Sequence, residues 1–364
     1  MNARVAPLRR LRPQAARIAL LGTGGVGSAV WSRLGGWTGF PLGERLTLVH
    51  VANSRHARTA VDGVVLADRP LPANGTLAGG EASVENALGD VGTRIIIDAT
   101  ASDEVSARHA HWLSRGIHVV TASKLGQGTS LSRWHAIQAA RVAGGTHYGD
   151  SATVGAGLPL LRSLRALQAG GDRIHAIAGV LSGSMAWLCN AYDGHRPFSG
   201  FVRQARDAGY TEPNPLDDLS GEDVRRKLLI LARASGFAIE AGAVRLDSPV
   251  PPALAALPPR AVDAALPQLD DAMRARYADA YRQRARLRFV ARIGDGGRAS
   301  VGLEALPAED VLAGGTGTDN RVAIWSDRYR AQPLLIQGPG AGADVTAAAL
   351  LDDVLRIQAL ATRG

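Results

Sequence analysis

The chain has 364 residues, 46% of them hydrophobic, which is enough for two domains with separate cores. Its net charge of +8 would suit a nucleic acid, but the arginines are scattered among acidic residues and aromatic residues make up only 5%, so we expect a solvated surface and no nucleic-acid partner. No apolar run approaches the length of a membrane span, so we expect no membrane partner either.

Two further features bear on the compartment. The first 17 residues contain arginines but no apolar segment, which predicts a disordered basic tail rather than a secretory signal. The single cysteine, Cys189, excludes an internal disulfide framework and fits a reducing cytoplasm. Because Cys189 lies in an apolar helical stretch, we expect a buried, inert thiol rather than a nucleophile.

Strand and helix patterns alternate over the first 150 residues. Continuous apolar runs predict strands at 17–21, 46–52, 94–99 and 117–121, and helical patterns follow at 26–34, 102–115 and 130–142. This alternation is typical of a parallel, doubly wound α/β sheet. We therefore predict a Rossmann-type dinucleotide-binding domain over residues 1–150.

The pattern changes after Gly149. A glycine-rich turn enters a helix at 151–168, a strand follows at 174–181, and helices continue to about residue 236. An irregular stretch with a short helix is expected at 249–266, before strands at 285–293, 299–303, 320–326 and 334–337. This order predicts a second, α+β domain with a mixed sheet over 151–337, followed by a C-terminal helix within 338–364.

A glycine cluster follows the first expected strand. Gly22, Gly24 and Gly27 have G-x-G-x-x-G spacing and open a helix. The first glycine permits a tight turn, the second lets the backbone approach a pyrophosphate, and the third lets the helix pack on the strand. In this context we favour a dinucleotide site over an ordinary turn, with contacts also from Gly25 and Val26.

The end of the second expected strand has no acidic residue to bind the ribose hydroxyls of NAD. Asn53, Ser54 and Arg55 stand there instead, with Arg58 close by. A basic residue without an acid suits a 2′-phosphate, so NADP is preferred over NAD. The alternative, that Arg55 is an ordinary surface residue, stays open.

The segment 209–227, GYTEPNPLDDLSGEDVRRK, gathers several carboxylates and one lysine. A proline-stiffened loop leads into a helix expected to begin near Ser220, which places Asp223 and Lys227 one turn apart on one face. Such a cluster could hold a small zwitterion and move a proton. Asp223 could equally cap the helix start, while Glu212 is the strongest functional candidate because a rigid loop is a costly place for an idle carboxylate.

Two other positions carry open alternatives. Lys124 comes just after a buried strand, where α/β sheets bind ligands, but a solvated loop lysine fits the position equally well. The glycine turn at Gly155 and Gly157 could bind a cation through backbone carbonyls, although an ordinary tight turn is favoured on spacing alone.

Taken together, these motifs resemble the homoserine dehydrogenase family. The resemblance extends from residue 17 to residue 357 and is weakest at 61–92 and 248–297. The motifs that carry it are the 209–227 segment, IHVVTASK, ATVGAGLP, GVLSGS and IQGPGAGADVTAA. The length resembles the short, monofunctional type without a kinase or regulatory domain. The family interconverts aspartate 4-semialdehyde and homoserine with NAD(P)H, on the route to threonine and methionine.

The resemblance implies roles for particular residues. It makes Lys227 and Lys124 the catalytic lysines, and it also places Lys124 near the cofactor. The residues that match the family's substrate site are Glu212, Asp218, Asp223, Gly183, Ser184 and Tyr210. It matches nucleotide contacts to Thr100 and Gly342. It also implies that residues 151–337 form a substrate-binding and dimerisation domain, with a dimer through the second sheet, and that the C-terminal helix completes the first domain. A sodium site made by the backbone carbonyls of Ser151, Val154, Ala156 and Leu158 is implied as well.

The chain departs from the family pattern at four positions. Ser151 replaces a usual Glu, Ser123 a usual Asn, Ser184 a usual Thr, and Asn214 a common Asp. The first departure puts the sodium site in doubt, and the others could alter the pocket without abolishing the chemistry. The rival hypotheses are a dehydrogenase of another amino aldehyde, a non-catalytic NADP sensor, and a cysteine-dependent aldehyde dehydrogenase, which the helical setting of Cys189 disfavours.

Overall fold

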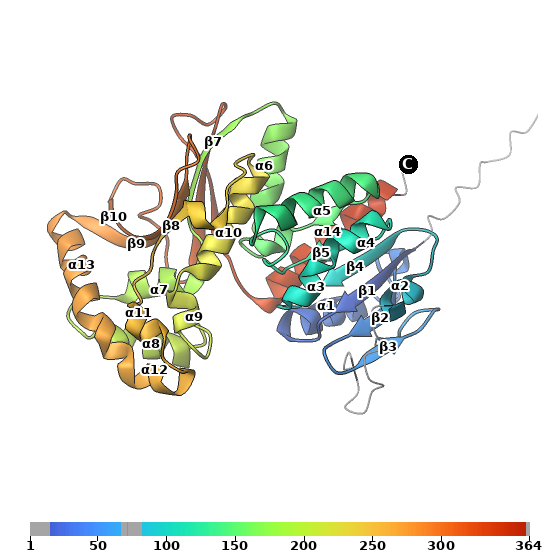
Figure 1. The fold of residues 1–364 in the computed structure, drawn as a ribbon, viewed down its shortest axis with the longest axis horizontal. Coiled ribbons are helices and arrows are strands. Elements are labelled where there is room, and N and C mark those ends of the chain that lie inside the picture. The colour runs from blue at the N-terminus through green and yellow to red at the C-terminus, as the bar shows by residue number, and fades with distance from the viewer. Residues whose placement is uncertain (1–14, 67–70, 72–81, 362–364) are drawn as a thin grey trace, which may run out of the picture.

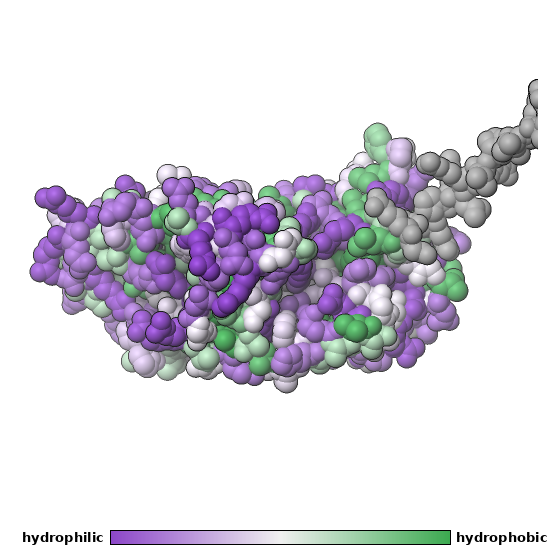
Figure 2. Space-filling model, turned by 90° about the horizontal axis from the view of Figure 1, so that it is seen from above, coloured by the Kyte–Doolittle hydropathy of each residue, from purple (hydrophilic) through white to green (hydrophobic). Residues whose placement is uncertain are grey.

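The computed structural model describes residues 15–66, 71 and 82–361, so most of the expected basic tail lies outside the described residues. The chain forms two lobes, each built on a six-stranded sheet (Figure 1). In the described ranges, no helix combines the length and apolar character needed to cross a membrane. On the face in Figure 2, hydrophilic residues cover most of the surface and apolar residues form only small patches.

The first sheet has the order β3-β2-β1-β4-β5-β6. All neighbouring strands are parallel except β3, which forms an antiparallel hairpin with β2. The strands are β1 Ala16–Leu21, β2 Leu46–Ala52, β3 Ala57–Thr59, β4 Arg94–Asp98, β5 His118–Thr121 and β6 Tyr148–Gly149. The predicted Rossmann-type sheet is confirmed, while β3 and β6 were missed because runs of two or three residues show no periodicity.

Helices cover both faces of this sheet. They are α1 Gly25–Gly36, α2 Ala82–Leu88, α3 Asp103–Ala107, α4 His109–Ser114 and α5 Leu131–Ala143, with a 3₁₀ turn at Gly43–Arg45. The single helix predicted at 102–115 is wrong, because the chain breaks at Arg108 into α3 and α4. The last helix, α14 Ala343–Ala361, returns to this lobe, where Leu350 and Val354 are fully buried in the same core as Ile18 of β1.

The second sheet has the order β12-β11-β7-β9-β10-β8. Its pairs are antiparallel except β8 with β10, so the predicted mixed sheet is confirmed. Its strands are β7 Ile174–Val180, β8 Val244–Asp247, β9 Ala285–Ile293, β10 Ala299–Pro307, β11 Asp319–Ser326 and β12 Leu334–Pro339. The four predicted late strands and β7 are present, and the short β8 was not predicted.

The helices of the second lobe lie mostly between β7 and β9 in the chain. They are α6 Leu160–Ala169, α7 Gly183–Ala191, α8 Phe198–Asp207, α9 Leu216–Leu219, α10 Glu222–Ala234, α11 Pro252–Ala255, α12 Pro259–Ala265 and α13 Asp270–Arg282. Further 3₁₀ turns lie at Ser151–Thr153, Ala241–Ala243 and Leu266–Leu269. Helix α13 was not predicted, because only Met273 and Ala280 of this charged helix are fully buried and the apolar pattern is weak.

Helix α10 lies where the two lobes meet (Figure 1). Its apolar face, which includes Leu228 and Leu231, is buried in the core of the second lobe. Its start depends on Gly221, whose φ of +80° and position against Phe289 leave no room for a side chain. At Gly128, a side chain would meet the backbone of Arg226, so α10 also packs closely on the loop that follows β5.

Candidate active site

The glycine turn after β1 has the geometry that its spacing predicted. Gly22 has a φ of +94°, and a Cβ there would lie 2.7 Å from the carbonyl oxygen of Ala99. A Cβ on Gly27 would lie 1.9 Å from the carbonyl oxygen of Gly22, so α1 packs directly on the turn. No atom lies within 4 Å of a Cβ built on Gly24, which leaves open space where the turn meets the start of α1.

The end of β2 is tied to this turn by Asn53. Its amide nitrogen donates to Thr23 Oγ1 at 2.9 Å, and its oxygen accepts from the backbone amides of Arg55 and His56. Arg55 is exposed beside this loop, and Arg58 lies on β3. The expected basic side chains therefore flank a site that has no carboxylate at the strand end.

A buried aspartate organises the ends of β4 and β5. Asp98 Oδ1 accepts from the amide and hydroxyl of Thr100, at 2.9 and 2.6 Å. Its Oδ2 lies 3.0 Å from both His109 Nε2 and Thr121 Oγ1. The sequence analysis missed Asp98, although an aspartate that closes the run RIIID was a usable signal, because a fully buried carboxylate must be hydrogen-bonded.

The network continues toward the loop of Lys124. The Thr121 hydroxyl accepts from the Ser123 amide at 2.9 Å, and the Ser123 and Ser106 hydroxyls lie 2.9 Å apart. These contacts fix the direction in which the chain leaves β5. Lys124 therefore leaves the sheet in a defined position rather than on a free loop.

Asp223 lies between the two lysines. Its Oδ2 is 2.9 Å from Lys227 Nζ, one turn along α10, and its Oδ1 is 3.4 Å from Lys124 Nζ. Lys227 Nζ also donates to the carbonyl oxygen of Leu181 at 2.8 Å. The structure therefore brings residues from both lobes into one ion cluster. Sequence spacing predicted that Asp223 and Lys227 lie close together, but it did not predict that Lys124 joins them.

The capping alternative for Asp223 is wrong. Helix α10 begins at Glu222, close to the predicted start near Ser220, but its N-cap is Gly221, which has no side chain. The Glu222 amide donates to the Ser220 hydroxyl at 3.3 Å, while both oxygens of Asp223 face ammonium groups. The carboxylate still lies in the first turn of the helix, where the helix dipole favours a negative charge.

The two acids of the cluster have different electrostatics. Burial raises the pKa of Asp223, but the ammonium groups of Lys227 and Lys124 outweigh this and hold it at about 2. Burial also raises the pKa of Asp218, opposed by hydrogen bonds from the Ser184 hydroxyl at 2.7 Å and the Glu212 amide at 2.8 Å. Asp223 is thus a fixed counter-ion, whereas Asp218 holds Ser184 and the loop of Glu212 in place.

Lysine is very rare in this chain. Of the 41 lysines and arginines, only Lys124 and Lys227 are lysines, and both contact Asp223. Everywhere else the chain uses arginine, whose guanidinium does not lose its proton in proteins. This count was available in the sequence and would have singled out both lysines without any motif.

The remaining predicted substrate residues lie around the cluster. Ser184 is buried near the start of α7, which begins at Gly183. Glu212 is exposed, and in the described part of the chain its carboxylate has no hydrogen-bond or ion-pair partner. Tyr210 is 44% exposed and lies 5.4 Å from the Trp187 ring. The acid and the phenol are therefore at the solvent-facing side of the cluster.

Arg233 is a residue that sequence reasoning missed. Its guanidinium is fully buried and donates to the carbonyl oxygens of Gln127 at 2.5 Å, Thr129 at 2.8 Å and Ile239 at 3.0 Å. Since Arg233 is on α10 and Gln127 follows Lys124, this side chain fixes the helix of Lys227 to the loop of Lys124. Sequence spacing could not identify it among so many arginines.

The second glycine turn lies beside α14. Ser151 donates from its amide and its hydroxyl to Asp353, both at 2.9 Å. Ala156 has a φ of +49°, unusual for a residue with a side chain, and the Leu158 carbonyl accepts from the Leu160 amide at 2.8 Å. In the described residues, no cluster of three or more histidine, cysteine or acidic side chains could hold a metal ion. Gly342, with a φ of +123°, precedes α14.

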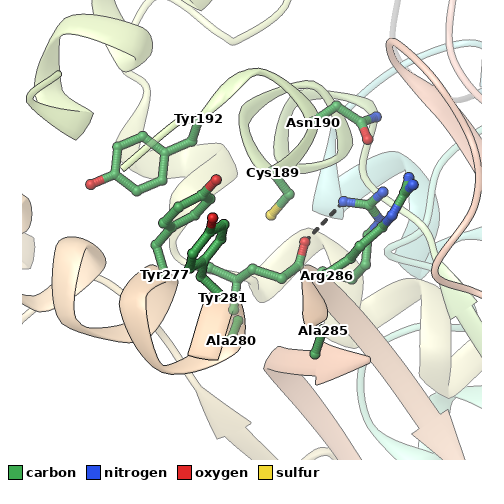
Figure 3. A pocket seen from close by; sticks show the side chains of 10 residues that line it. Cys189, Asn190, Tyr192, Tyr277, Ala280, Tyr281, Ala285 and Arg286 are labelled. Carbon is green, nitrogen blue, oxygen red and sulfur yellow. Dashed lines mark hydrogen bonds between the residues drawn. The ribbon is translucent and has the colours of Figure 1, made fainter. Parts of the chain in front are cut away.

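Cys189 lies in the wall of a separate pocket of about 210 Å³, together with Tyr277, Tyr281 and Arg286 (Figure 3). Burial raises the pKa of its thiol to about 11. A thiol protonated at neutral pH is a poor nucleophile, which argues against the cysteine-dependent alternative.

Comparison with known proteins identifies the family. Residues 22–148 match the family model described as the NAD-binding domain of homoserine dehydrogenase, and residues 159–355 match the model described as homoserine dehydrogenase. The chain belongs to the homoserine dehydrogenase family. The glycine turn lies in the first matched region, and Asp223 and Lys227 lie in the second.

Relatives and solved structures agree with this assignment. A maize bifunctional aspartokinase/homoserine dehydrogenase 2 is 39% identical over 268 residues, 72% of this chain but 29% of the relative's length. The homoserine dehydrogenase of Emericella nidulans is 36% identical over 278 residues, 73% of this chain and 76% of that protein. The chain therefore spans less than a third of the bifunctional relative and about three quarters of the fungal one.

Two solved structures share the fold over nearly the whole chain. A protein of unknown function from Candida auris has a TM-score of 0.86 and 31% identity, covering 94% of this chain and 98% of that one. A hyperthermophilic archaeal homoserine dehydrogenase in complex with NADPH has a TM-score of 0.71 and 19% identity, covering 94% and 98%.

Proposed function

We propose that this protein is a homoserine dehydrogenase that interconverts aspartate 4-semialdehyde and homoserine. The observation that carries the proposal is the pair of lysines on Asp223, placed where the carboxyl end of β5 meets α10. Membership of the homoserine dehydrogenase family supports the choice of reaction. The lobe that carries the glycine turn is the proposed binding site of the cofactor.

A nicotinamide cofactor supplies or takes up the hydride in this reaction. The residues of the chain hold the cofactor, orient the substrate and manage charge and protons. Gly22, Gly24 and Gly27 shape the turn for a pyrophosphate at the start of α1, with Gly25 and Val26 in the first helical turn. In this proposal Thr100, which is hydrogen-bonded to Asp98, and Gly342 supply further nucleotide contacts.

The lysine cluster suits carbonyl reduction. The aldehyde oxygen gains negative charge as the hydride arrives, and an ammonium group beside it stabilises that charge and donates the proton. In the reverse direction the amine accepts the proton of the hydroxyl group. Asp223 holds Lys227 and Lys124 in place, so little reorganisation is needed when charge develops.

The carboxylate of Glu212 suits the substrate ammonium. It is exposed and unpaired within the described residues, while its own backbone amide is fixed by Asp218 at 2.8 Å. Ser184, which donates to Asp218, completes the substrate site in this proposal together with Gly183 and Tyr210. A dehydrogenase of a different amino aldehyde is the second candidate, and the serines at 123 and 184 are the positions that would decide it.

The test is to follow the loss of NADPH or NADH absorbance with aspartate 4-semialdehyde as substrate. We expect turnover by the wild type and a loss of at least about a thousandfold in kcat for Lys227→Ala, since general acid–base catalysis contributes of that order. No turnover with either cofactor would refute the proposal. Full activity of Lys227→Ala would remove the assigned role of that lysine.

We also propose that NADP is preferred. The absence of an acid at the end of β2, and the exposed Arg55 there, support binding of a 2′-phosphate. Arg55→Ala should lower kcat/KM with NADPH about tenfold while leaving kcat/KM with NADH nearly unchanged. Equal losses with both cofactors would contradict the preference.

A sodium ion, a homodimer and a cytoplasmic location complete the proposal. The backbone carbonyls of Ser151, Val154, Ala156 and Leu158, of which only the first three residues are buried, are hard oxygen ligands of the type sodium takes. Replacing sodium by choline should therefore lower stability or activity. The edge strand β12, with Leu335 38% exposed, favours a dimer through the second sheet, which sedimentation would detect. The single cysteine suits a reducing compartment.

A further inference from the structure

Three buried polar side chains of the first lobe form a hydrogen-bonded chain. They are Asp98 at the end of β4, His109 of α4 and Tyr148 of β6. Asp98 Oδ2 lies 3.0 Å from His109 Nε2, and His109 Nδ1 lies 2.9 Å from the Tyr148 hydroxyl oxygen. The proposed reaction uses neither the imidazole nor the phenol. Because buried polar groups are costly unless they are well aligned, this chain indicates a constraint on the structure around it.

The hydrogen bonds of the chain run in one direction. The other groups on the Asp98 carboxylate are donors, namely the amide and hydroxyl of Thr100 and the hydroxyl of Thr121. His109 Nε2 therefore completes a shell of donors around an ionised carboxylate. Burial and nearby carboxylates raise the pKa of Tyr148 well above its usual value, so its hydroxyl keeps its proton and donates to His109 Nδ1. His109 is thereby held as the neutral ring with its proton on Nε2.

The turn that begins at Lys124 rests directly on this chain. A Cβ built on Gly126 would lie 2.5 Å from the Tyr148 hydroxyl oxygen and 3.0 Å from His109 Nδ1. The backbone of the turn thus lies against the hydrogen bond between the two side chains, and only a glycine fits at the point of contact. Any shift of the phenol or the imidazole therefore moves the turn.

The same turn also contacts the second lobe. A Cβ built on Gly128 would lie 2.9 Å from the carbonyl oxygen of Arg226 on α10. The Gly128 amide donates to the Lys124 carbonyl at 2.7 Å, which closes the turn over residues 124–128. A closed turn that is in contact with both lobes leaves Lys124 little freedom to move relative to Asp223.

We propose that His109 and Tyr148 are positioning residues for Lys124. Their hydrogen bond determines where the turn lies, and with it the 3.4 Å approach of the Lys124 ammonium group to Asp223. Neither side chain touches the substrate, because both are buried beneath the turn. The inference rests on the proposed dehydrogenase function, in which this lysine acts beside the reacting carbonyl group.

Tyr148→Phe tests the inference with the smallest change. It removes the hydroxyl group and keeps the ring, which packs in the core of the first lobe. We expect kcat with NADPH and aspartate 4-semialdehyde to fall about tenfold, and KM for the aldehyde to stay within about twofold, because one buried hydrogen bond contributes of that order. Tyr192→Phe, at a buried tyrosine in the core of the second lobe, is the matched control and should keep full activity.

Two replacements of His109 separate hydrogen bonding from packing. His109→Gln keeps an amide nitrogen that can donate to Asp98, whereas His109→Leu fills a similar volume without a donor. Among the folded protein, kcat of His109→Gln should exceed that of His109→Leu about tenfold. Equal kcat in the two variants would show that packing alone matters at this position.

Amide hydrogen exchange of the 124–128 turn gives a readout that does not depend on turnover. In Tyr148→Phe this turn should exchange about tenfold faster than in the wild type, while α7 in the other lobe exchanges as before. A wild type without turnover would refute the proposed function, and the exchange rates would still decide the positioning role.

Three results would overturn the inference. Unchanged kcat in Tyr148→Phe would mean that the hydrogen bond does not position Lys124. Unchanged exchange of the turn in that variant would mean that other contacts hold it. Equally faster exchange throughout the first lobe would make the pair purely structural.

Discussion

The glycine turn and the lysine cluster are the two halves of the proposed site, and they are built from different parts of the chain. At the turn, Gly22 and Gly27 matter because a side chain would collide with backbone oxygen atoms. At the cluster, Lys124, Asp223 and Lys227 matter through charged groups held by side-chain contacts from both lobes. The turn therefore depends on shape, and the cluster depends on charge and on the alignment of the lobes.

Exchange of lysine for arginine at the cluster should have the largest effect. Lys227→Arg keeps the positive charge but replaces a compact group that can lose a proton by one that does not. We expect kcat to fall about a thousandfold, with stability nearly unchanged. Arg226→Lys, the neighbouring position on α10, is the matched control for kcat and thermal unfolding. Activity retained in Lys227→Arg would mean that charge alone suffices.

A methyl group on Gly27 tests the dependence of the turn on shape. A Cβ 1.9 Å from the Gly22 carbonyl oxygen forces the helix and strand apart, so Gly27→Ala should cost about 3 kcal/mol of stability and lower cofactor affinity. Gly24→Ala is the control, since Gly24 has a φ of −69° and open space around a Cβ. It should unfold like the wild type and lose only cofactor affinity, measured by NADPH fluorescence titration.

Arg233 tests whether the alignment of the lobes is needed. Arg233→Met should destabilise the protein by about 2–4 kcal/mol, because carbonyl groups such as that of Gln127 lose their buried donor. In the protein that remains folded, kcat should fall more than KM rises, since Lys124 is no longer held beside Asp223. Chemical denaturation and steady-state kinetics measure the two effects, and a stability loss with unchanged kcat would make Arg233 purely structural.

The smallest effect expected is the pH dependence contributed by Asp223. Its folded pKa of about 2 lies below the unfolded value of about 3.9, so its stabilisation is present above pH 4 and is lost as the pH falls toward 2. With the side chain 39% exposed, solvent limits this to about 1 kcal/mol or less. The difference in urea midpoint between wild type and Asp223→Asn should shrink over that range, and a constant difference would contradict the ion-cluster origin.

The contrast between a local turn and a cluster built from both lobes explains which features could be predicted from the sequence. Glycine spacing and branched apolar runs are local signals, so β2, β9 and the turn at Gly22 were predicted closely. The network of Asp98 and the contacts of Arg233 are long-range, because their partners lie on other elements and no spacing marks them. The charged α13 and the four-residue β8 have too little periodicity to be recognised. Pairing of Lys124 with Asp223 required the two lobes to be placed together.

The scarcity of lysine gives the protein an unusual spectroscopic property. With two lysines in 364 residues, nitrogen-15 labelling of lysine side chains yields one resonance for each ammonium group of the cluster. Titration of these two signals reads the protonation state of each amine separately, with and without cofactor. The question of which lysine transfers the proton thus becomes a measurement of two peaks rather than an inference from mutants.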